Sequence, residues 1–564
     1  MMPFLCFRQK KMNYSKKRSR ESRAAIERLY ITMRQLIIRG SYKPSGMSGS
    51  ALKEALLSLQ PEIYGSLIDP EKVELDGLLY VAERLPQGIE ECSIIKLIAR
   101  EGFSEAGHQA IMPAKRRRNC YRIDRERMYV EMSRGRSDIY DILTHLTFLN
   151  IEADKIKKHA LDSKGKPTSN WLRLGEVVDA EERQESIDEK QALVYLSNVL
   201  GRTVAETKIA VDQFASARAV NSLYRFVYYL GQVAVEERLK QRRKQVLFSA
   251  KLREVIGHHV YGEAWANAVK KAIDKNFGLH RPIHIVSANL HSFKNILFGF
   301  SALPNENFAN ISALATATAQ NPELDEQITH YAEKNGLISL PDAAGTNLDV
   351  QIIDLAKVKW EKLEKPQRSD EEMPLLIVMD YAFGEQAYEC MDELLKPYKG
   401  KSLEHKLPIR SVSVMGKAGI LNGSKGEIMI PSAHVFEGTA DNYPLDNILS
   451  LEDFRGSEIK SYAGTMVTVL GTSLQNRDVL RHFLTSTWNA VGIEMEGAHY
   501  QKAIQSAARI RKSIPEKIKV AYAYYASDNP LVSGSTLSSG SLGAEGIMPT
   551  YLISQKILEK ILER

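Results

Sequence analysis

Apolar positions follow two different spacings along this chain of 564 residues. From Ser22 to Gly40 apolar side chains recur every three or four positions, which predicts an amphipathic helix. The same spacing continues through most of residues 138–274, so we expect a mostly α-helical N-terminal domain. Residues 41–135 mix short apolar groups with turn sequences, and their pattern does not order into a sheet.

The pattern changes near residues 278–282, Gly-Leu-His-Arg-Pro. Beyond them, short apolar runs alternate with helical stretches, which is typical of a largely parallel sheet with helices on both faces. We therefore expect a basic tail (1–21), a helical domain (22–277) and an α/β domain (278–564) with a mixed, mostly parallel sheet. The expected strands are 283–286, 350–355, 375–379, 411–415, 427–430, 465–470 and 519–526. The expected helices are 293–300, 385–395, 477–485, 499–509 and 548–562.

The composition is that of an ordinary soluble protein, with 44% hydrophobic and 26% charged residues. The apolar runs are too short to span a bilayer, and residues 1–8 do not resemble a signal peptide. The four cysteines are widely spaced, which predicts neither disulfides nor a zinc site. A cytoplasmic protein is expected, starting at Met1 or Met12.

Positive charge is concentrated in residues 1–45, which hold twelve Lys and Arg and two Glu. A solvated tail and helix face is favoured over binding to nucleic acid or to a membrane. The second basic run, Lys115–Arg118, is interpreted as a solvated loop, with a phosphate clamp as the alternative. His145, His258 and His259 have no partners at metal-ligand spacing, so we predict packing or surface roles and no metal.

Two stretches near the C-terminus carry candidate chemistry. Residues 492–500 place Glu496 at the start of a helix, after a short apolar segment. Residues 524–531 place Asp528 after a buried strand, in a Ser-Asp-Asn-Pro turn. Both carboxylates are expected at the ends of adjacent segments, where open α/β sheets bind ligands.

Further polar loops follow the predicted strands. Asn289 and His291 follow the first strand, and Gly384 lies in a loop after the third. Lys417 follows Gly416 in a glycine-containing loop, where backbone amides and a cation suit an anion.

Taken together, these motifs resemble the nucleoside phosphorylase superfamily, and most closely AMP nucleosidases, over residues 281–564. The Glu494-Met495-Glu496 sequence resembles the Met-Glu ribose motif of the superfamily, and residues 527–531 resemble its Ser-Asp-x-Pro block. Further matches lie at 285–295, 383–384, 415–421 and 425–431.

The resemblance implies cleavage of the N-glycosidic bond of a purine nucleoside or nucleotide, by water or by phosphate. Asp528 would protonate the leaving base, a task for which a carboxyl at a strand end is suited. Glu496 would accept hydrogen bonds from the sugar hydroxyls, with Met495 against the sugar face.

The other implied contacts concern phosphate and base. Lys417 and the amides of Gly384 and Gly416 would hold a phosphate, with Asn289 and His291 completing the pocket. An aromatic over the base is also expected, and the candidates are Phe436 and Tyr525, which are equally well explained as core residues. No cofactor is expected, and superfamily members are commonly homo-oligomers.

One departure leaves an alternative open. AMP nucleosidases tend to have an Arg-Gly-Glu-Gly-Thr block where this chain has Phe436 to Thr439, so an arginine is missing. The alternative is a nucleotide-binding sensor with weakened catalysis that regulates the helical domain. Glu494 and Glu437 could each be a solvated carboxylate or a water-activating group.

Overall fold

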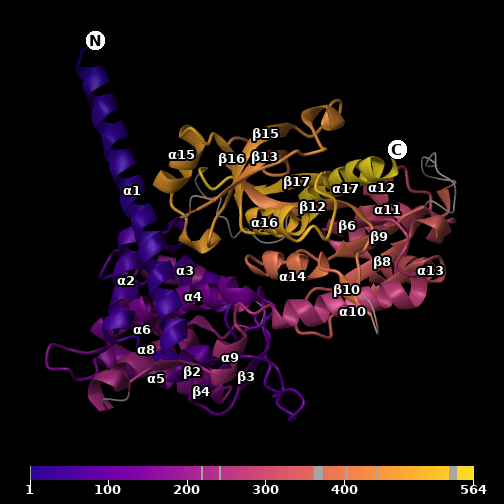
Figure 1. Ribbon diagram of the computed structural model, residues 1–564. Coiled ribbons are helices and arrows are strands. Elements are labelled where there is room, and N and C mark those ends of the chain that lie inside the picture. The colour runs from indigo at the N-terminus through magenta and orange to yellow at the C-terminus, as the bar shows by residue number, and fades with distance from the viewer. Residues whose placement is uncertain are drawn as a thin grey trace. The chain divides into compact units, whose positions relative to one another are not determined.

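The computed structural model describes residues 2–217, 220–240, 243–360, 373–400, 404–437, 439, 441–532 and 543–563. The chain divides into two compact units (Figure 1). Unit 1 comprises Met1–Ser133, Asp138–His258 and Ser473–Val479; unit 2 comprises Arg134–Ser137, His259–Thr472 and Leu480–Arg564. The expected division at residues 277–278 differs from this one in α10 (Val260–Phe277), which packs on α14 (Gln386–Leu394) of unit 2, and in the two short segments 134–137 and 473–479.

Unit 1 is rich in helices. The first, α1 (Met2–Arg39), includes both the expected amphipathic helix and the residues expected to form a basic tail. The others are α2 (Met47–Leu59), α3 (Leu75–Ala82), α4 (Gly135–Ala160), α5 (Ser169–Glu182), α6 (Glu189–Leu200), α7 (Val204–Ser216), α8 (Leu223–Lys240) and α9 (Ala250–Val255).

Unit 1 also contains a sheet that its sequence pattern does not predict. Its strand order is β1-β5-β2-β4-β3, with β2 parallel to both β4 and β5. The strands are too short to show a clear alternation of apolar and polar residues. They are β1 (Ser41–Tyr42), β2 (Ile94–Ile98), β3 (Cys120–Arg122), β4 (Arg127–Glu131) and β5 (Gln245–Phe248).

The basic run Lys115–Arg118, expected in a solvated loop, lies partly in the interior of unit 1. The Arg118 side chain is fully buried, and its Nε donates to Asp138 Oδ1 over 2.8 Å. Its guanidinium also pairs with Asp141, which accepts 2.8 and 3.0 Å hydrogen bonds from Arg116. Arg116 and Arg118 thus form ion pairs with carboxylates of α4 in the interior. The local sequence does not reveal this ion pairing.

Unit 2 is built on a sheet that has ten strands among the described residues, ordered β14-β13-β15-β16-β12-β6-β9-β8-β7, with β17 paired to both β12 and β13. The sheet is mixed rather than mostly parallel, since β12 is antiparallel to β16 and β8 to β9. The strands of this sheet are β6 (Ile283–Ser287), β7 (Leu337–Leu340), β8 (Val350–Asp354), β9 (Leu375–Met379), β12 (Ile409–Ile420), β13 (Ile428–Phe436), β14 (Asn442–Pro444), β15 (Ser461–Thr468), β16 (Ala490–Glu494) and β17 (Lys519–Asp528). A separate hairpin joins β10 (Tyr398–Lys399) to β11 (Glu404–His405).

Two apolar cores cover the faces of this sheet. One includes Trp265 of α10, Met391 of α14 and Tyr500 of α16. The other includes Phe293 of α11, Ile328 of α13 and Ile557 of α17. The remaining unit 2 helices are α11 (Leu290–Ala302), α12 (Ile311–Gln320), α13 (Pro322–Lys334), α16 (Gly497–Gln505), which continues as a π-helix (Ser506–Arg511), and α17 (Ile547–Leu562). Helix α15 (Arg477–Thr485) begins in unit 1 and ends in unit 2.

Strands covered on both faces have no solvated side, which explains why β6, β8 and β9 are buried at every position. Of these three, β9 is apolar throughout, whereas β6 and β8 include buried polar residues such as His284 and Gln351. The expected strands and helices of this unit are therefore found close to their predicted positions. One difference matters for the site: β12 continues to Ile420, so Gly416 and Lys417 belong to a strand and not to the expected loop.

Loss of the buried guanidinium in unit 1 tests its structural role. In Arg118→Met the Asp138 and Asp141 carboxylates lose a cation in the interior, and removing one partner of a buried pair costs about 3–5 kcal/mol. We expect thermal unfolding of the full chain to begin at a clearly lower temperature. The matched control, Arg117→Met, replaces an exposed neighbour and should unfold like the wild type. Equal melting of the two variants would contradict the assignment.

Candidate active site

The candidate site of unit 2 forms where strand β12 changes its neighbour. On one side β12 pairs with β6 as far as Val414, opposite Ser287. From Gly419 onward the same side pairs with β16, opposite Ile493. Because β6 runs parallel to β12 and β16 runs antiparallel, the carboxyl ends of these two strands approach each other along one flank of β12. Changes of this kind in α/β sheets leave a crevice for ligands.

Glu496 lies at this change of neighbour, between the end of β16 and the start of α16. Its side chain is 7% exposed. The Gly384 amide donates to Oε1 over 2.9 Å, and the Met495 amide donates to Oε2 over 3.3 Å. Gly384 lies between β9 and α14 and has φ +55°, a backbone conformation that glycine adopts readily. The predicted residues Glu496, Met495 and Gly384 are therefore in contact.

A second carboxyl, Glu494, is buried beside Glu496. It accepts hydrogen bonds from the Thr468 hydroxyl and from the Glu496 and Gly497 amides. Burial raises the pKa of Glu494 to about 7. Burial and then the neighbouring Glu494 charge raise the pKa of Glu496 to about 8. At neutral pH the pair therefore retains a proton. Because Glu494 is buried, it is not the solvated carboxylate that was one of the two expectations. Glu437 is buried as well, and accepts from the Leu470 amide over 3.2 Å.

Buried tyrosines surround these carboxyls. The Tyr500 hydroxyl hydrogen-bonds Ser287 Oγ over 2.7 Å and accepts from the Ala382 amide over 3.2 Å. Tyr381 packs against Gly416 so closely that a Cβ there would lie 2.5 Å from the Tyr381 hydroxyl oxygen. Gly416 is thus required for space next to the site.

Asp528 ends strand β17, on the other side of β12, directly opposite Gly419. Its side chain is buried; the Ser527 hydroxyl donates to Oδ1, whereas Oδ2 has no hydrogen-bond partner within the described part of the chain. Burial raises the pKa of Asp528 to about 6, although Ser527, Lys417 and Lys425 act in the opposite direction. Lys417 is exposed on β12, and its positive charge lowers the pKa of Asp528.

The other predicted site residues make their principal contacts elsewhere. Asn289 caps α11 by accepting from the Ser292 amide over 3.0 Å. His291 lies 3.2 Å from the Tyr551 hydroxyl. Phe436 packs edge-on against His499 with ring centroids 4.7 Å apart, and Tyr525 lies against the core that includes α17.

The segment Arg134–Ser137 belongs to unit 2 and was not predicted as part of the site. Ser137 Oγ accepts from the Glu385 amide over 2.9 Å, and Arg136 pairs with Glu385 at 3.1 Å. The Arg134 guanidinium lies 4.8 Å from the centre of the Phe383 ring. Roughly 250 residues separate these partners, so local sequence gives no sign of the contact. The only available signal is the Ser-Arg-Gly-Arg-Ser sequence itself, which combines glycine, hydroxyls and cations.

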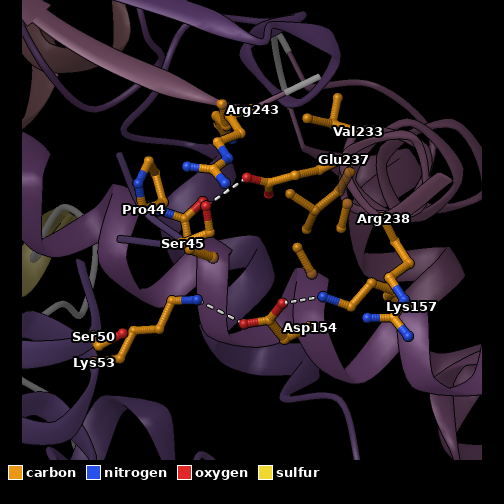
Figure 2. A pocket seen from close by; sticks show the side chains of 15 residues that line it. Pro44, Ser45, Ser50, Lys53, Asp154, Lys157, Val233, Glu237, Arg238 and Arg243 are labelled. Carbon is orange, nitrogen blue, oxygen red and sulfur yellow. Dashed lines mark hydrogen bonds and ion pairs between the residues drawn. The ribbon is translucent and has the colours of Figure 1, made fainter. Parts of the chain in front are cut away.

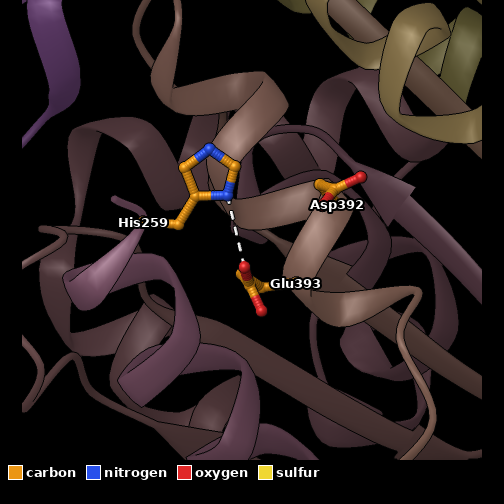
Figure 3. A group of neighbouring side chains, drawn as sticks. All are labelled: His259, Asp392 and Glu393. Atoms are coloured by element: carbon orange, nitrogen blue, oxygen red, sulfur yellow. Dashed lines mark hydrogen bonds and ion pairs between the residues drawn. The ribbon is translucent and has the colours of Figure 1, made fainter. Parts of the chain in front are cut away.

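His259, Asp392 and Glu393 form a group whose candidate ligand atoms lie within 4.8 Å of one another (Figure 3). The carboxylates already have cationic partners, because Arg511 pairs with Asp392 at 2.7 Å and Lys396 with Glu393 at 2.5 Å. His259 Nδ1 lies 3.2 Å from Glu393. We interpret this group as an ion-pair cluster that joins α10 to α14.

Comparison with known proteins assigns the chain to a protein family. A profile described as "Family of unknown function (DUF6909)" matches residues 50–313 and 306–563. The chain belongs to this family. A comparison with curated proteins finds no match to this DUF6909 member. No helix in the described parts of the chain combines the length and apolar character needed to cross a membrane.

Solved structures similar to this DUF6909 member cover about half of it. A futalosine hydrolase mutant of Helicobacter pylori strain 26695 is 10% identical with a TM-score of 0.32, covering 50% of this chain and 99% of that chain. AMP nucleosidase from Bacteroides thetaiotaomicron VPI-5482 is 14% identical with a TM-score of 0.30, covering 53% and 99%. Uridine phosphorylase from Schistosoma mansoni is 12% identical with a TM-score of 0.31, covering 52% and 90%. At these values the neighbours carry no argument about activity.

The raised pKa of Glu496 predicts how stability depends on pH. Between the ordinary pKa of 4.5 and about 8, the unfolded chain loses this proton while the folded chain keeps it, so stability falls as pH rises. Glu496→Gln removes the ionisation. We therefore expect the melting temperature of the variant, relative to wild type, to be higher at pH 8 than at pH 5.

The matched control is Glu458→Gln, which changes an exposed carboxyl of the same unit. Its melting temperature relative to wild type should be the same at both pH values. If Glu496→Gln showed the same relative melting temperature at pH 5 and pH 8, the raised pKa would be wrong.

Proposed function

We propose that this DUF6909 member cleaves the N-glycosidic bond of purine nucleosides or nucleotides, in the manner of an AMP nucleosidase. One observation supports the proposal that Asp528 and Glu496 act together: β17 and β16 both pair with β12 at Gly419, β17 through Asp528 and β16 through Ile493, the residue before Glu494. One carboxyl has an oxygen without a hydrogen-bond partner in the described residues, and the other is fixed by backbone amides. The motifs at 494–496 and 527–531 support the same assignment.

Asp528 is proposed as the general acid. As the C1′–N9 bond breaks, its electron pair moves into the purine, and a proton passes from the Asp528 carboxyl to N7. A pKa of about 6 leaves part of the Asp528 population protonated near neutral pH, which is what a general acid requires. The carboxylate recovers its proton from the water or phosphate that attacks C1′, or from solvent.

Glu496 is proposed to bind the sugar. In the ionised form, each of its oxygens accepts one amide hydrogen bond and keeps a second lone pair, so both can accept from neighbouring ribose hydroxyls. Fixed acceptors of this kind gain strength as positive charge develops on the sugar ring in the transition state. Met495, whose amide is bonded to this carboxyl, would lie against the sugar face.

Lys417 is proposed to bind a phosphate group, either the 5′-phosphate of a nucleotide or free phosphate. Its support is its position on β12, close enough to lower the pKa of Asp528. Arg134 brings a second cation to the turn that contains Gly384, which compensates for the arginine missing before Glu437. Within the described residues, the contacts found for Asn289, His291, Phe436 and Tyr525 are with other parts of unit 2, and their roles in holding phosphate and base are proposed from the motifs alone.

The decisive assay incubates the full-length protein with purine nucleosides and nucleotides and measures free base. Asp528→Asn preserves shape but cannot donate the proton, so turnover should fall by roughly 10²- to 10⁴-fold. For the wild type, we expect kcat to decrease as pH rises above about 6, because Asp528 loses its proton, and this dependence should disappear in the variant.

Asp446→Asn, an exposed aspartate of the same unit, is the matched control and should keep full activity. Ribose 1-phosphate among the products would indicate phosphorolysis, and ribose or ribose 5-phosphate would indicate hydrolysis. Full turnover by Asp528→Asn would refute the site. Tight nucleotide binding without release of free base would favour the nucleotide-binding sensor over the enzyme.

A further inference from the structure

Unit 1 contains a cavity of about 450 Å³ that the proposed glycosidase does not use (Figure 2). It is lined by residues of α2, α4 and α8, by the chain near Ser45 and by residues just before β5. All lining residues belong to unit 1. The volume is within the range of small-molecule sites.

The charged lining residues are mostly basic. There are five cations, Lys53, Lys157, Arg238, Arg243 and Lys244, against two acids, Asp154 and Glu237. Asp154 accepts from Lys53 Nζ over 2.6 Å and from Lys157 Nζ over 2.7 Å. Glu237 accepts from Ser45 Oγ over 2.6 Å. Figure 2 shows these contacts of both acids. Two carboxylates cannot neutralise five cations, so the lining keeps an excess of positive charge.

Lys244 gives this cavity its most unusual feature. The residue is 4% exposed, and within the described residues it makes no hydrogen bond and no ion pair. Burial lowers the pKa of Lys244, while Cys92 and Glu237 act in the opposite direction. Burying an ammonium without a partner is costly, so a cavity wall that contains one points to an anion as the missing partner.

We propose that this cavity binds a small phosphate-bearing anion through Lys244 and the cations around it. Ammonium and guanidinium groups converging from several elements suit the several acceptor oxygens of a phosphate group. Leu230, Val233 and Ala234 form an apolar part of the lining, which accommodates an uncharged portion of the ligand. A nucleic acid is a poorer fit, because the cations line a cavity instead of following an extended surface.

The test measures binding of inorganic pyrophosphate and of ADP to the full-length protein by calorimetry at constant ionic strength. Lys244→Met replaces the ammonium by an apolar group of similar length. It should weaken binding by roughly 10- to 100-fold, the effect of losing a hydrogen-bonded charge. Without ligand this variant should melt no lower than wild type, because it removes a buried charge. Arg238→Met, on the exposed part of the lining, provides a second variant that should weaken binding without a core substitution.

Two controls separate this cavity from other effects. Lys251→Met alters an exposed lysine of unit 1 and should bind like wild type. In a Lys417→Met background, which removes the proposed phosphate contact of unit 2, Lys244→Met should still weaken pyrophosphate binding, so the two proposals can fail independently. Unchanged binding in both Lys244→Met and Arg238→Met would overturn the proposal. So would equal binding of malonate, preference for a short oligonucleotide, or no binding of pyrophosphate and ADP at millimolar concentration.

Discussion

The hydrogen bond from the Gly384 amide to the Glu496 carboxyl joins the turn after β9 to the end of β16. Around it, two buried carboxyls are held by backbone amides and a hydroxyl, and within the described residues neither Glu494 nor Glu496 has an ion pair with Lys or Arg. A fold that only needed stability would gain little from such an arrangement, because desolvation raises the pKa of both groups. Buried carboxyls with strongly perturbed pKa values are common at functional sites.

Close approach of backbone and rings makes this arrangement possible. A Cβ at Gly416 would lie 2.5 Å from the Tyr381 hydroxyl oxygen, and one at Gly497 would lie 2.3 Å from His434. His434 is itself fully buried and lies 3.0 Å from the Tyr524 hydroxyl; burial lowers its pKa to about 3, so it stays neutral. The site therefore depends on glycines that leave room and on neutral aromatic groups that exclude water.

The sequence predicted much of unit 2 because most of its strands are rich in apolar residues and are separated by turn signals. It predicted that Glu496 precedes a helix, which the structure confirms, and that Asp528 follows a buried strand, whereas in the structure Asp528 is the last residue of that strand. It did not predict that β12 continues to Ile420, since glycines there resemble a loop in sequence. The segment Arg134–Ser137 could not be assigned to the site, because contacts between residues so distant along the chain have no local signal.

In unit 1 the sequence predicted less of the structure, for other reasons. Helical spacing identified the helices within 22–40 and 138–274 but not α2 and α3, and strands of two to five residues left the sheet undetected. The basic run at 115–118 was expected in solvent, because its partners Asp138 and Asp141 lie about twenty residues later on another element. Charge patterns in sequence thus indicate a surface by default, and burial by ion pairing appears only in three dimensions.

The most direct test of the account is the titration of the Glu496 carboxyl carbon by ¹³C NMR in protein labelled at glutamate side chains. The signal is assigned by its loss in Glu496→Gln. The account predicts a midpoint near 8, far above the ordinary 4.5. A midpoint between 4 and 5 would show a solvated, ordinary carboxylate and would contradict the buried pair on which the proposed chemistry rests.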